Sequence, residues 1–303
     1  MEVTQMPFYT PLRYPGGKRK LALFLEALIQ HNNLSACTYV EPYAGGAGLA
    51  LHLLFSGTAR KILINDVDPH IYYFWLSVLE YTDELCRLIS DTPVTMDVWY
   101  RQQDIRKNIT NRSAVEIGFS TLFLNRTNRS GILKGGVIGG KRQDGAWKMN
   151  VRFQKNDIIK RIQKIAEQKD KITVFRNDAV VFLNSIEPML SPSDSLVYLD
   201  PPYYEKGSAL YENFYKSEDH RNVADRVSTL NLPWLVSYDN VEPIQRLYSS
   251  YPAITYSLNY TAQAKMLGSE FMAFSPRLQL PDSVYTGTQC FPLLRDITLL
   301  RSA

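Results

Sequence analysis

A glycine-rich turn between two short strands restricts the fold of this chain more than any other feature. An apolar strand over residues 39–41 runs directly into residues 42–48 (PYAGGAG), and a helix is expected over 49–54. A second strand follows over 61–65 and ends at Asp66. This order of strand, glycine-rich turn, helix, strand and acidic residue is typical of the first half of a doubly wound α/β fold that binds nucleotides.

The remaining pattern divides the chain into strand-containing and helical stretches. Apolar strands are expected at 172–175, 196–199, 234–237, 254–257 and 270–274, and the last two are close enough in sequence to pair antiparallel. Between the early and late strands, the periodicity predicts helices over 94–130 and 154–168, separated by a glycine-rich basic loop or hairpin at 131–147. We therefore predict an α/β domain formed by residues 1–88 and 166–303, interrupted by a mainly helical domain at 89–165.

The charges are unevenly distributed, although the formal net charge is only +4. Residues 100–164 contain 15 basic and four acidic residues, a net charge of +11. The rest of the chain contains 19 basic and 26 acidic residues, a net charge of −7. A basic segment on an acidic body indicates a region that binds a polyanion, although a solvated basic surface is the simpler alternative.

Composition excludes several other classes of protein. The hydrophobic fraction of 45% and the charged fraction of 21% are those of a globular protein rather than a disordered chain. Three cysteines without C-x-x-C spacing and four scattered histidines predict neither a zinc site nor a disulfide scaffold. The sequence shows no signal peptide and no apolar run of about 18 residues, so we expect a cytoplasmic protein with no membrane partner.

The glycine-rich turn and its flanking carboxylates suit a zwitterionic ligand. Small residues after a strand let the backbone come close to a ligand that faces the next helix N-terminus. The spacing differs from the dinucleotide fingerprint, and Glu41 directly before the turn suits an amino group better than a pyrophosphate. Asp66 can accept hydrogen bonds from ribose hydroxyls. These features favour S-adenosylmethionine over NAD, although tight packing of the turn would explain the glycines equally well.

A second motif, Asp200-Pro201-Pro202-Tyr203, follows the strand at 196–199. Two consecutive prolines cannot continue a ladder, so the chain leaves the sheet in a fixed shape at its carboxyl edge, where ligands bind in such folds. The Asp200 carboxylate and the Pro201 carbonyl are then two acceptors that can hold an exocyclic amine, and Tyr203 offers a flat face to a base. Residues 237–240 end the next strand at this edge and could line the same pocket. Plain strand-end turns are the alternative for both segments.

The order of these motifs resembles that of the Dam-like, alpha-group DNA adenine-N6 methyltransferases from Pro11 to about residue 275. The shared order starts with residues 14–18 (YPGGK) and continues through 41–48, 65–68, the basic insertion and 200–203. The resemblance implies a seven-stranded Rossmann-like sheet with an inserted, mainly helical target-recognition domain. It also implies that S-adenosylmethionine is bound by Tyr14, Gly17, Lys18, Glu41, Tyr43, Gly45, Gly46, Gly48, Asp66 and Asp178.

Within the insertion, residues 124–131 (LNRTNRSG) resemble the family segment that enters DNA. A short basic and polar run closed by glycine can approach phosphates and base edges. Arg129 stands where the family has an aromatic residue and Lys134 where it has an arginine, so the reading of the target sequence is expected to differ. The candidate DNA-binding residues are Asn125, Arg126, Asn128, Arg129, Ser130 and Lys134.

We therefore predict a site-specific enzyme that transfers a methyl group from S-adenosylmethionine to the N6 amine of an adenine flipped out of duplex DNA. Catalysis is assigned to Asp200, Pro201, Pro202 and Tyr203, with Tyr203 stacking on the base and no metal required. The alternatives are methylation of cytosine N4 or of adenine in RNA, a protein-glutamine methyltransferase, and a DNA-binding regulatory module with secondary or lost activity. A restriction nuclease or a defence-cassette protein is the expected kind of partner, and the oligomeric state is left open.

Overall fold

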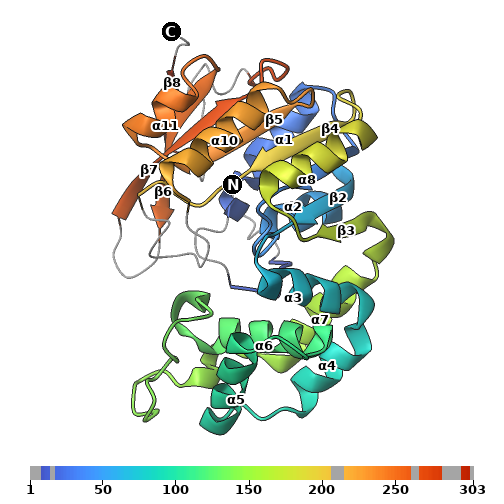
Figure 1. Ribbon diagram of the computed structural model, residues 1–303, viewed down its shortest axis with the longest axis vertical. Helices are drawn as coiled ribbons and strands as arrows, with labels where there is room; N and C mark the ends of the chain where they lie inside the picture. The colour runs from blue at the N-terminus through green and yellow to red at the C-terminus, as the bar shows by residue number, and fades with distance from the viewer. Residues whose placement is uncertain (1–7, 14–17, 206–214, 261–265, 282–294, 301–303) are drawn as a thin grey trace, which may run out of the picture.

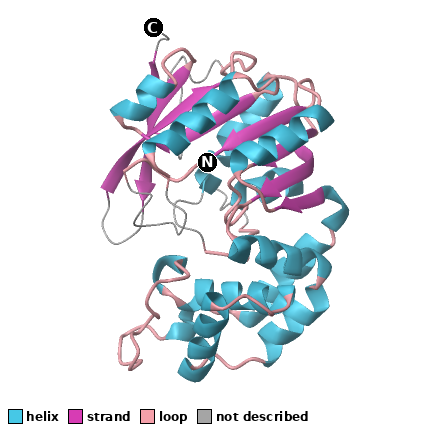
Figure 2. Ribbon diagram, in the orientation of Figure 1, coloured by secondary structure: helices cyan, strands magenta, loops and turns pink. Residues whose placement is uncertain are grey.

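The computed structural model describes residues 8–13, 18–205, 215–260, 266–281 and 295–300. Figures 1 and 2 show two parts, one that holds the described strands and one built from helices. Helix α3 (Pro69–Glu80) lies where the two parts meet. The chain therefore leaves the sheet after the second strand, forms the helical part and returns to the sheet.

A mixed sheet of eight strands forms the framework, in the order β3-β2-β1-β4-β5-β7-β6-β8. Seven strands were expected, and this number is one too low because the tail after Pro281, which shows no clear strand pattern in sequence, adds β8 beside β6. The strands are β1 (Cys37–Glu41), β2 (Ala59–Asn65), β3 (Ile172–Phe175), β4 (Ser195–Leu199), β5 (Trp234–Asp239), β6 (Ala253–Tyr260), β7 (Met266–Phe274) and β8 (Arg295–Leu300).

Strand direction determines where the polar motifs meet. Strands β1 to β5 pair in parallel, so their carboxyl ends lie at one edge of the sheet. Strand β7 runs antiparallel to both β5 and β6, which confirms the pairing predicted for the last two expected strands. Residues that follow parallel strands are therefore brought together at the carboxyl edge, although they are far apart in the sequence.

Helices cover both faces of the sheet and build the second part of the molecule (Figure 1). The sheet is flanked by α1 (Ala22–His31), α2 (Gly48–Phe55), α8 (Ala179–Ile186), α10 (Ser217–Ser228) and α11 (Glu242–Leu247). The second part contains α4 (Thr82–Asp91), α5 (Met96–Lys107), α6 (Ala114–Thr127) and α7 (Lys155–Ala166). Short 3-10 turns are η1 (Lys18–Leu21), η2 (Arg129–Gly131), η3 (Met149–Arg152), η4 (Lys169–Lys171) and η5 (Glu187–Met189). In the described ranges, no helix is long and apolar enough to cross a membrane.

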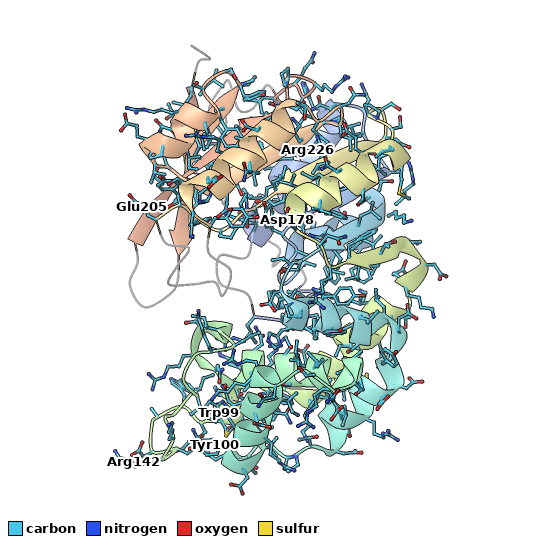
Figure 3. The ribbon with its side chains drawn as sticks, viewed as in Figure 1. Trp99, Tyr100, Arg142, Asp178, Glu205 and Arg226 are labelled. Carbon is cyan, nitrogen blue, oxygen red and sulfur yellow. The ribbon has the colours of Figure 1, made fainter. Side chains whose placement is uncertain are left out.

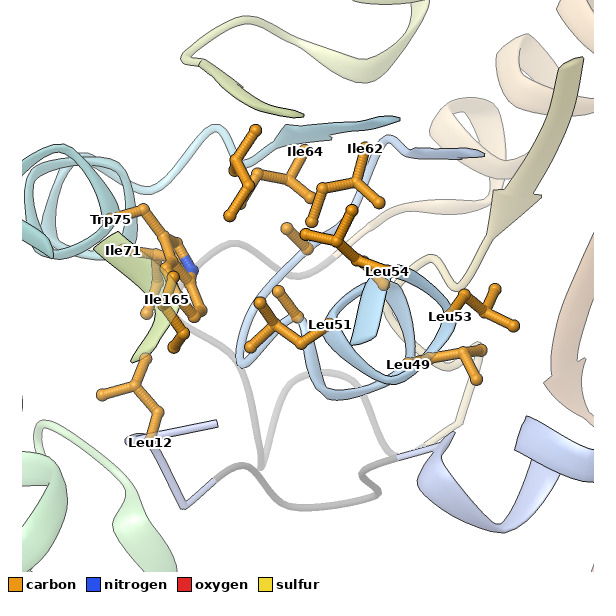
Figure 4. Packing of buried hydrophobic residues seen from close by; sticks show 14 of the residues in the cluster. Leu12, Leu49, Leu51, Leu53, Leu54, Ile62, Ile64, Ile71, Trp75 and Ile165 are labelled. Carbon is orange, nitrogen blue, oxygen red and sulfur yellow. The ribbon is translucent and has the colours of Figure 1, made fainter. Parts of the chain in front are cut away.

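Side chains alternate along the central strands between two hydrophobic cores. Tyr39 of β1 belongs to the core shared with α1, α2 and α3, whereas Val40 belongs to the core shared with α8, α10 and α11. Figure 4 shows how the first core extends past the sheet, with Ile71 and Trp75 of α3 beside Ile165 of α7. The helical part therefore packs against the sheet domain through α3 and is not connected to it by a linker alone.

The helical part differs in one respect from its prediction. A single helical stretch was expected over 94–130, but α5 and α6 are separate, because the backbone at Asn111 has a φ of 63° and Ser113 starts a new helix with a capping box to Glu116. Residues 131–147 form a loop, as expected, with one isolated bridge between Asn128 and Val137. The domain boundaries near residues 88 and 166 stay a prediction.

Candidate active site and DNA-facing loop

Carboxylates follow each of four adjacent parallel strands at the carboxyl edge of the sheet. Glu41 is the last residue of β1, Asp66 follows β2, Asp178 lies just after β3 and Asp200 follows β4. Figure 3 shows Asp178 at the edge that faces the helical part. The structure therefore brings together the acidic residues that the sequence motifs singled out.

The glycine-rich turn is held in shape from both sides. Gly45 has a φ of 45°, its N–H donates to Asp66 Oδ2 over 2.9 Å, and its carbonyl accepts from Trp75 Nε1 over 2.9 Å. Ala47, at the start of α2, has left-handed backbone angles although it is not glycine. Gly46 is buried and Gly48 is the first residue of α2. The turn is a preformed surface at the N-terminus of α2, as expected for a ligand site.

Two carboxylates beside this turn have raised pKa values. Burial raises the pKa of Glu41 to about 8, although the Tyr39 hydroxyl donates to it over 3.0 Å. Burial, together with the neighbouring charge of Asp68, raises the pKa of Asp66 to about 7. Within the described ranges, no lysine or arginine is paired with either carboxylate. Buried carboxylates without a cationic side chain fit a ligand that brings its own cation, such as the amino and sulfonium groups of S-adenosylmethionine.

The remaining cofactor candidates have different surroundings. Asp178 is exposed and caps α8, where Oδ1 accepts from the N–H groups of Val180 and Val181. Tyr43 is half-buried, and its hydroxyl lies 3.0 Å from that of Tyr215. This contact joins the turn to the segment that leads into α10. Tyr14 and Gly17 lie outside the described residues.

Asp200 is fixed by two groups that contact the same oxygen. Its Oδ1 accepts from Ser237 Oγ over 2.8 Å and lies 3.3 Å from Lys18 Nζ, while Oδ2 has no hydrogen-bond partner among the described residues. Burial raises the pKa of Asp200, and the charge of Lys18 opposes this rise. Pro201 is buried and Pro202 half-buried directly after it. One carboxylate oxygen is thus anchored, and the other has no protein partner in the described ranges.

Tyr203 belongs to a buried polar cluster that sequence reasoning found only in part. Lys18 Nζ donates to the Tyr203 hydroxyl over 2.6 Å and to Glu270 Oε2 over 3.2 Å, and the Tyr203 hydroxyl donates to Glu270 Oε2 over 2.7 Å. Lys18, which the sequence assigned to the cofactor site, contacts this cluster. Glu270 was not selected as a site residue from the sequence. The pattern that could have indicated it is an acidic residue within an otherwise apolar strand (SEFMAF).

The chain after Tyr203 is tied to the end of β5. The Asp239 carboxylate accepts from the backbone N–H groups of Tyr204 and Glu205 over 2.9 and 3.0 Å. Ser237 and Asp239 therefore both support the Asp-Pro-Pro-Tyr segment. Residues 237–240, expected as a pocket wall or a plain turn, contain two of its anchors.

Three of the expected DNA-binding residues lie inside the helical part. Asn125 accepts from Arg13 N over 2.7 Å and donates to Gly131 O over 2.9 Å, and Arg126 Nε donates to Pro11 O over 2.6 Å. Asn128 is fully buried and accepts from Trp99 Nε1. These three side chains are buried and hydrogen-bonded within the protein. They support the loop from inside, and the direct DNA contact expected from the sequence stays a prediction.

The other three expected residues are exposed on the loop. Arg129, Ser130 and Lys134 have exposed side chains, and Ser130 has a φ of 56°. Farther along the loop, Arg142 and Trp147 are also exposed, and Figure 3 shows Arg142 at the far tip of the helical part. Gly131 is required at its position, because a Cβ there would lie 2.2 Å from Arg13 O. The loop thus presents cations and an indole to solvent from a backbone fixed by the buried residues.

These features together suit one class of enzyme: an α/β fold with a glycine-rich turn and carboxylates at the carboxyl edge of its sheet, and a separate basic surface. Residues 14–263 match the family model of the D12 class N6 adenine-specific DNA methyltransferases. This match spans most of the chain, so the chain belongs to that family. It is an adenine-specific DNA methyltransferase that uses S-adenosylmethionine.

More distant similarities were also found. A type II methyltransferase, M.MjaIII of Methanocaldococcus jannaschii, is 21% identical over 206 residues, which cover 63% of this chain and 68% of that protein. Among solved structures, an rRNA methyltransferase, AviRa of Streptomyces viridochromogenes, is 13% identical with a TM-score of 0.37, covering 91% of this chain and 94% of its own. A SAM-dependent methyltransferase of Agrobacterium tumefaciens is 10% identical with a TM-score of 0.39, covering 85% of this chain and 62% of its own.

Proposed function

We propose that this enzyme is a Dam-like methyltransferase that modifies an adenine flipped out of duplex DNA. Residues 1–88 and 166–303 form its catalytic domain, and residues 89–165 form its target-recognition domain. The observation that carries the proposal is the state of Asp200, whose Oδ1 is anchored by Ser237 and Lys18 while Oδ2 has no partner among the described residues. A base amine can reach such an acceptor only after leaving the duplex stack.

The cofactor site lies at the glycine-rich turn. S-adenosylmethionine supplies an electrophilic methyl group when it is bound there. Glu41 would hold its amino group, the turn of Gly45, Gly46 and Gly48 would hold its methionine end, and Asp66 would accept hydrogen bonds from its ribose. Tyr14, Gly17, Lys18, Tyr43 and Asp178 complete the proposed set of cofactor residues.

The catalytic residues orient the adenine amine. Asp200 Oδ2 accepts one N6–H and the Pro201 carbonyl accepts the other, so that the N6 lone pair faces the methyl carbon. Pro202 keeps this segment rigid, and the Tyr203 ring stacks on the base. When the N6–C bond forms, the sulfur–methyl bond of the cofactor would break, its thioether would be the leaving group, and the amine would lose a proton. Asp200 is placed to take that proton, because burial raises the pKa of its carboxyl.

The exposed loop provides the DNA contacts. Arg129, Ser130 and Lys134 are proposed to contact phosphates and base edges, while Asn125, Arg126 and Asn128 hold the loop that presents them. The net charge of +11 over residues 100–164 strengthens this attraction to a polyanion. The similarity to a type II methyltransferase favours a restriction nuclease as the functional partner, and a DNA substrate favours the cytoplasm.

Long-read sequencing of DNA from methylation-deficient bacteria that express the protein tests this proposal. We expect N6-methyladenine at one short sequence, and no such mark in cells that express Asp200→Ala. Modified cytosine at that sequence, or no modified base in DNA, would contradict the proposed substrate.

A further inference from the structure

We propose that Glu270 is a positioning residue for methyl transfer, which holds Tyr203 and Lys18 so that Asp200 keeps one oxygen for the base amine. The inference rests on the roles proposed above for Asp200 and Tyr203. Glu270 lies on the antiparallel strand β7 and follows none of the parallel strands that carry the other site carboxylates.

Glu270 is a buried carboxylate in a largely apolar strand, so its charge has to be stabilised by nearby groups. Its exposed fraction is 2%, and it lies between Asp239 of β5 and Tyr256 of β6 in the sheet register. The residues after it in β7, Phe271 to Phe274, belong to the two hydrophobic cores. A buried carboxylate costs several kcal/mol unless it is paired and hydrogen-bonded. The groups that pair with Glu270 therefore indicate its role.

One oxygen of Glu270 receives two donors from the active site. Oε2 accepts from the Tyr203 hydroxyl over 2.7 Å and from Lys18 Nζ over 3.2 Å. The Tyr203 hydroxyl in turn accepts from Lys18 Nζ over 2.6 Å, so its donor and acceptor directions are both defined. The Tyr203 ring is anchored at its far end, and Lys18 lies 4.9 Å from the ring centroid. This anchoring fixes the ring face that is proposed to stack on the base.

Glu270 also shares Lys18 with Asp200. Lys18 Nζ lies 3.3 Å from Asp200 Oδ1 and 3.2 Å from Glu270 Oε2, so neither carboxylate pairs with it alone. The ionised cluster has one positive and two negative charges, a net charge of −1. Positive charge develops on the adenine amine as the methyl group is transferred, and a net negative cluster beside it stabilises that charge. Replacing Glu270 by a neutral residue removes both this net charge and the competition for Lys18.

The test compares Glu270→Gln with Glu270→Asp and with Glu242→Gln, which removes an exposed carboxylate from α11. We expect Glu270→Gln to lower kcat about 100-fold, in the range for removing one preorganised electrostatic contact, while its S-adenosylmethionine affinity by calorimetry stays within about threefold of wild type. Glu270→Asp keeps the charge and should recover part of kcat. Glu242→Gln should behave as wild type.

The pH dependence of kcat separates this role from a purely structural one. Burial lowers the pKa of Lys18, but the charges of Asp200, Tyr203 and Glu270 raise it well above its usual value. Glu270→Gln removes one of these charges and should therefore lower the pKa of Lys18. When kcat is measured up to about pH 10.5, its alkaline decline should begin at a lower pH in Glu270→Gln than in wild type or Glu270→Asp. The ionisable groups around Lys18 in this comparison are Tyr198, Asp200, Tyr203 and Glu270.

Two outcomes would overturn the inference. One is a folded Glu270→Gln with wild-type kcat, and the other is a lower kcat with an unchanged alkaline limb. If Glu270→Gln does not fold, Glu270→Asp is used for the test instead. Its shorter side chain withdraws the carboxylate from Tyr203, which should lower kcat without loss of cofactor affinity. A wild-type kcat in Glu270→Asp would overturn the inference. A wild-type enzyme that methylates another base would contradict the proposed substrate, whereas these comparisons would still decide the role of Glu270.

Discussion

The carboxyl edge of the sheet and the exposed loop of the helical part use charge in opposite ways. At the sheet edge, Lys18 and Glu270 are buried and each contacts several polar groups. On the loop, Arg129, Lys134 and Arg142 are exposed to solvent. Buried, paired charges can fix the geometry of a site, whereas exposed charges can gain affinity for a polyanion by releasing its counterions. The difference implies that mutations in the two regions should change different measured quantities.

The largest effect should come from removing the cation of the buried cluster. Lys18→Met leaves Asp200 and Glu270 without their shared cation, and breaking a buried ion pair in this way costs about 3–5 kcal/mol of unfolding free energy. We expect a large fall in Tm and no detectable methyl transfer. Arg142→Ala is the matched control, because its partner Asp144 is exposed and the variant should keep the wild-type Tm. Similar Tm values for the two variants would show that the cluster is not a tightly coupled unit.

The second effect concerns the backbone that holds the loop. Gly131→Ala places a Cβ about 2.2 Å from Arg13 O at a φ of +79°, so the loop must shift. Gly57→Ala is a matched control with the same φ but nothing within 4 Å. We expect Gly131→Ala to lose DNA affinity in fluorescence anisotropy while its S-adenosylmethionine affinity is kept, and Gly57→Ala to keep both. Equal DNA affinities would mean that the contact with Arg13 does not position the loop.

A smaller effect is expected from the exposed cations themselves. Arg129→Ala combined with Lys134→Ala removes two proposed phosphate contacts, which should reduce the slope of log Kd against log salt by about 1.8. The control, Lys169→Ala with Lys171→Ala, removes two exposed cations that precede β3 and thus lie at the opposite edge of the sheet. An unchanged salt slope in the loop variant would mean that the DNA does not contact Arg129 and Lys134.

The smallest effect should be a pH dependence of cofactor binding. Because burial raises the pKa of Glu41 to about 8, the free enzyme holds this carboxyl protonated at neutral pH. Pairing with an amino group requires the ionised form, so S-adenosylmethionine affinity should rise several-fold between about pH 7 and pH 8. Calorimetry on Glu41→Gln should show weaker binding without this rise. The raised pKa of Glu41 also makes the free energy of unfolding fall as pH increases from 4.5 to about 8. The reason is that this carboxyl binds its proton more tightly in the folded state than in the unfolded state.

The sequence predicted most of the sheet edge because its signals are local. Apolar strands followed by Glu41, Asp66 and Asp200 can be recognised from hydrophobic periodicity, glycine and proline, which act within a few residues. The carboxyl ends of parallel strands then meet at one edge by topology alone. The glycine-rich turn and the Asp-Pro-Pro-Tyr segment were located for the same reason.

The contacts that were missed depend on tertiary structure. Glu270 lies 252 residues from Lys18 in the sequence and 67 from Tyr203, so nothing local indicates that they meet. Asn125 and Arg126 look like DNA-binding residues in a basic run, but both are buried and hydrogen-bonded to the backbone of residues 13 and 11. Polar residue type alone does not separate a buried support from an exposed contact.

Methyl transfer by Asp200→Ala tests the central claim most directly. Purified wild-type and variant enzymes would be compared for incorporation of labelled methyl groups into adenine of duplex DNA, with S-adenosylmethionine binding measured by calorimetry on the same samples. We predict that Asp200→Ala loses methylation by about 1,000-fold or more while cofactor binding is kept, because the lost acceptor acts on the amine alone. A variant that methylates adenine at the wild-type rate would contradict the assignment of Asp200 as the residue that holds the amine.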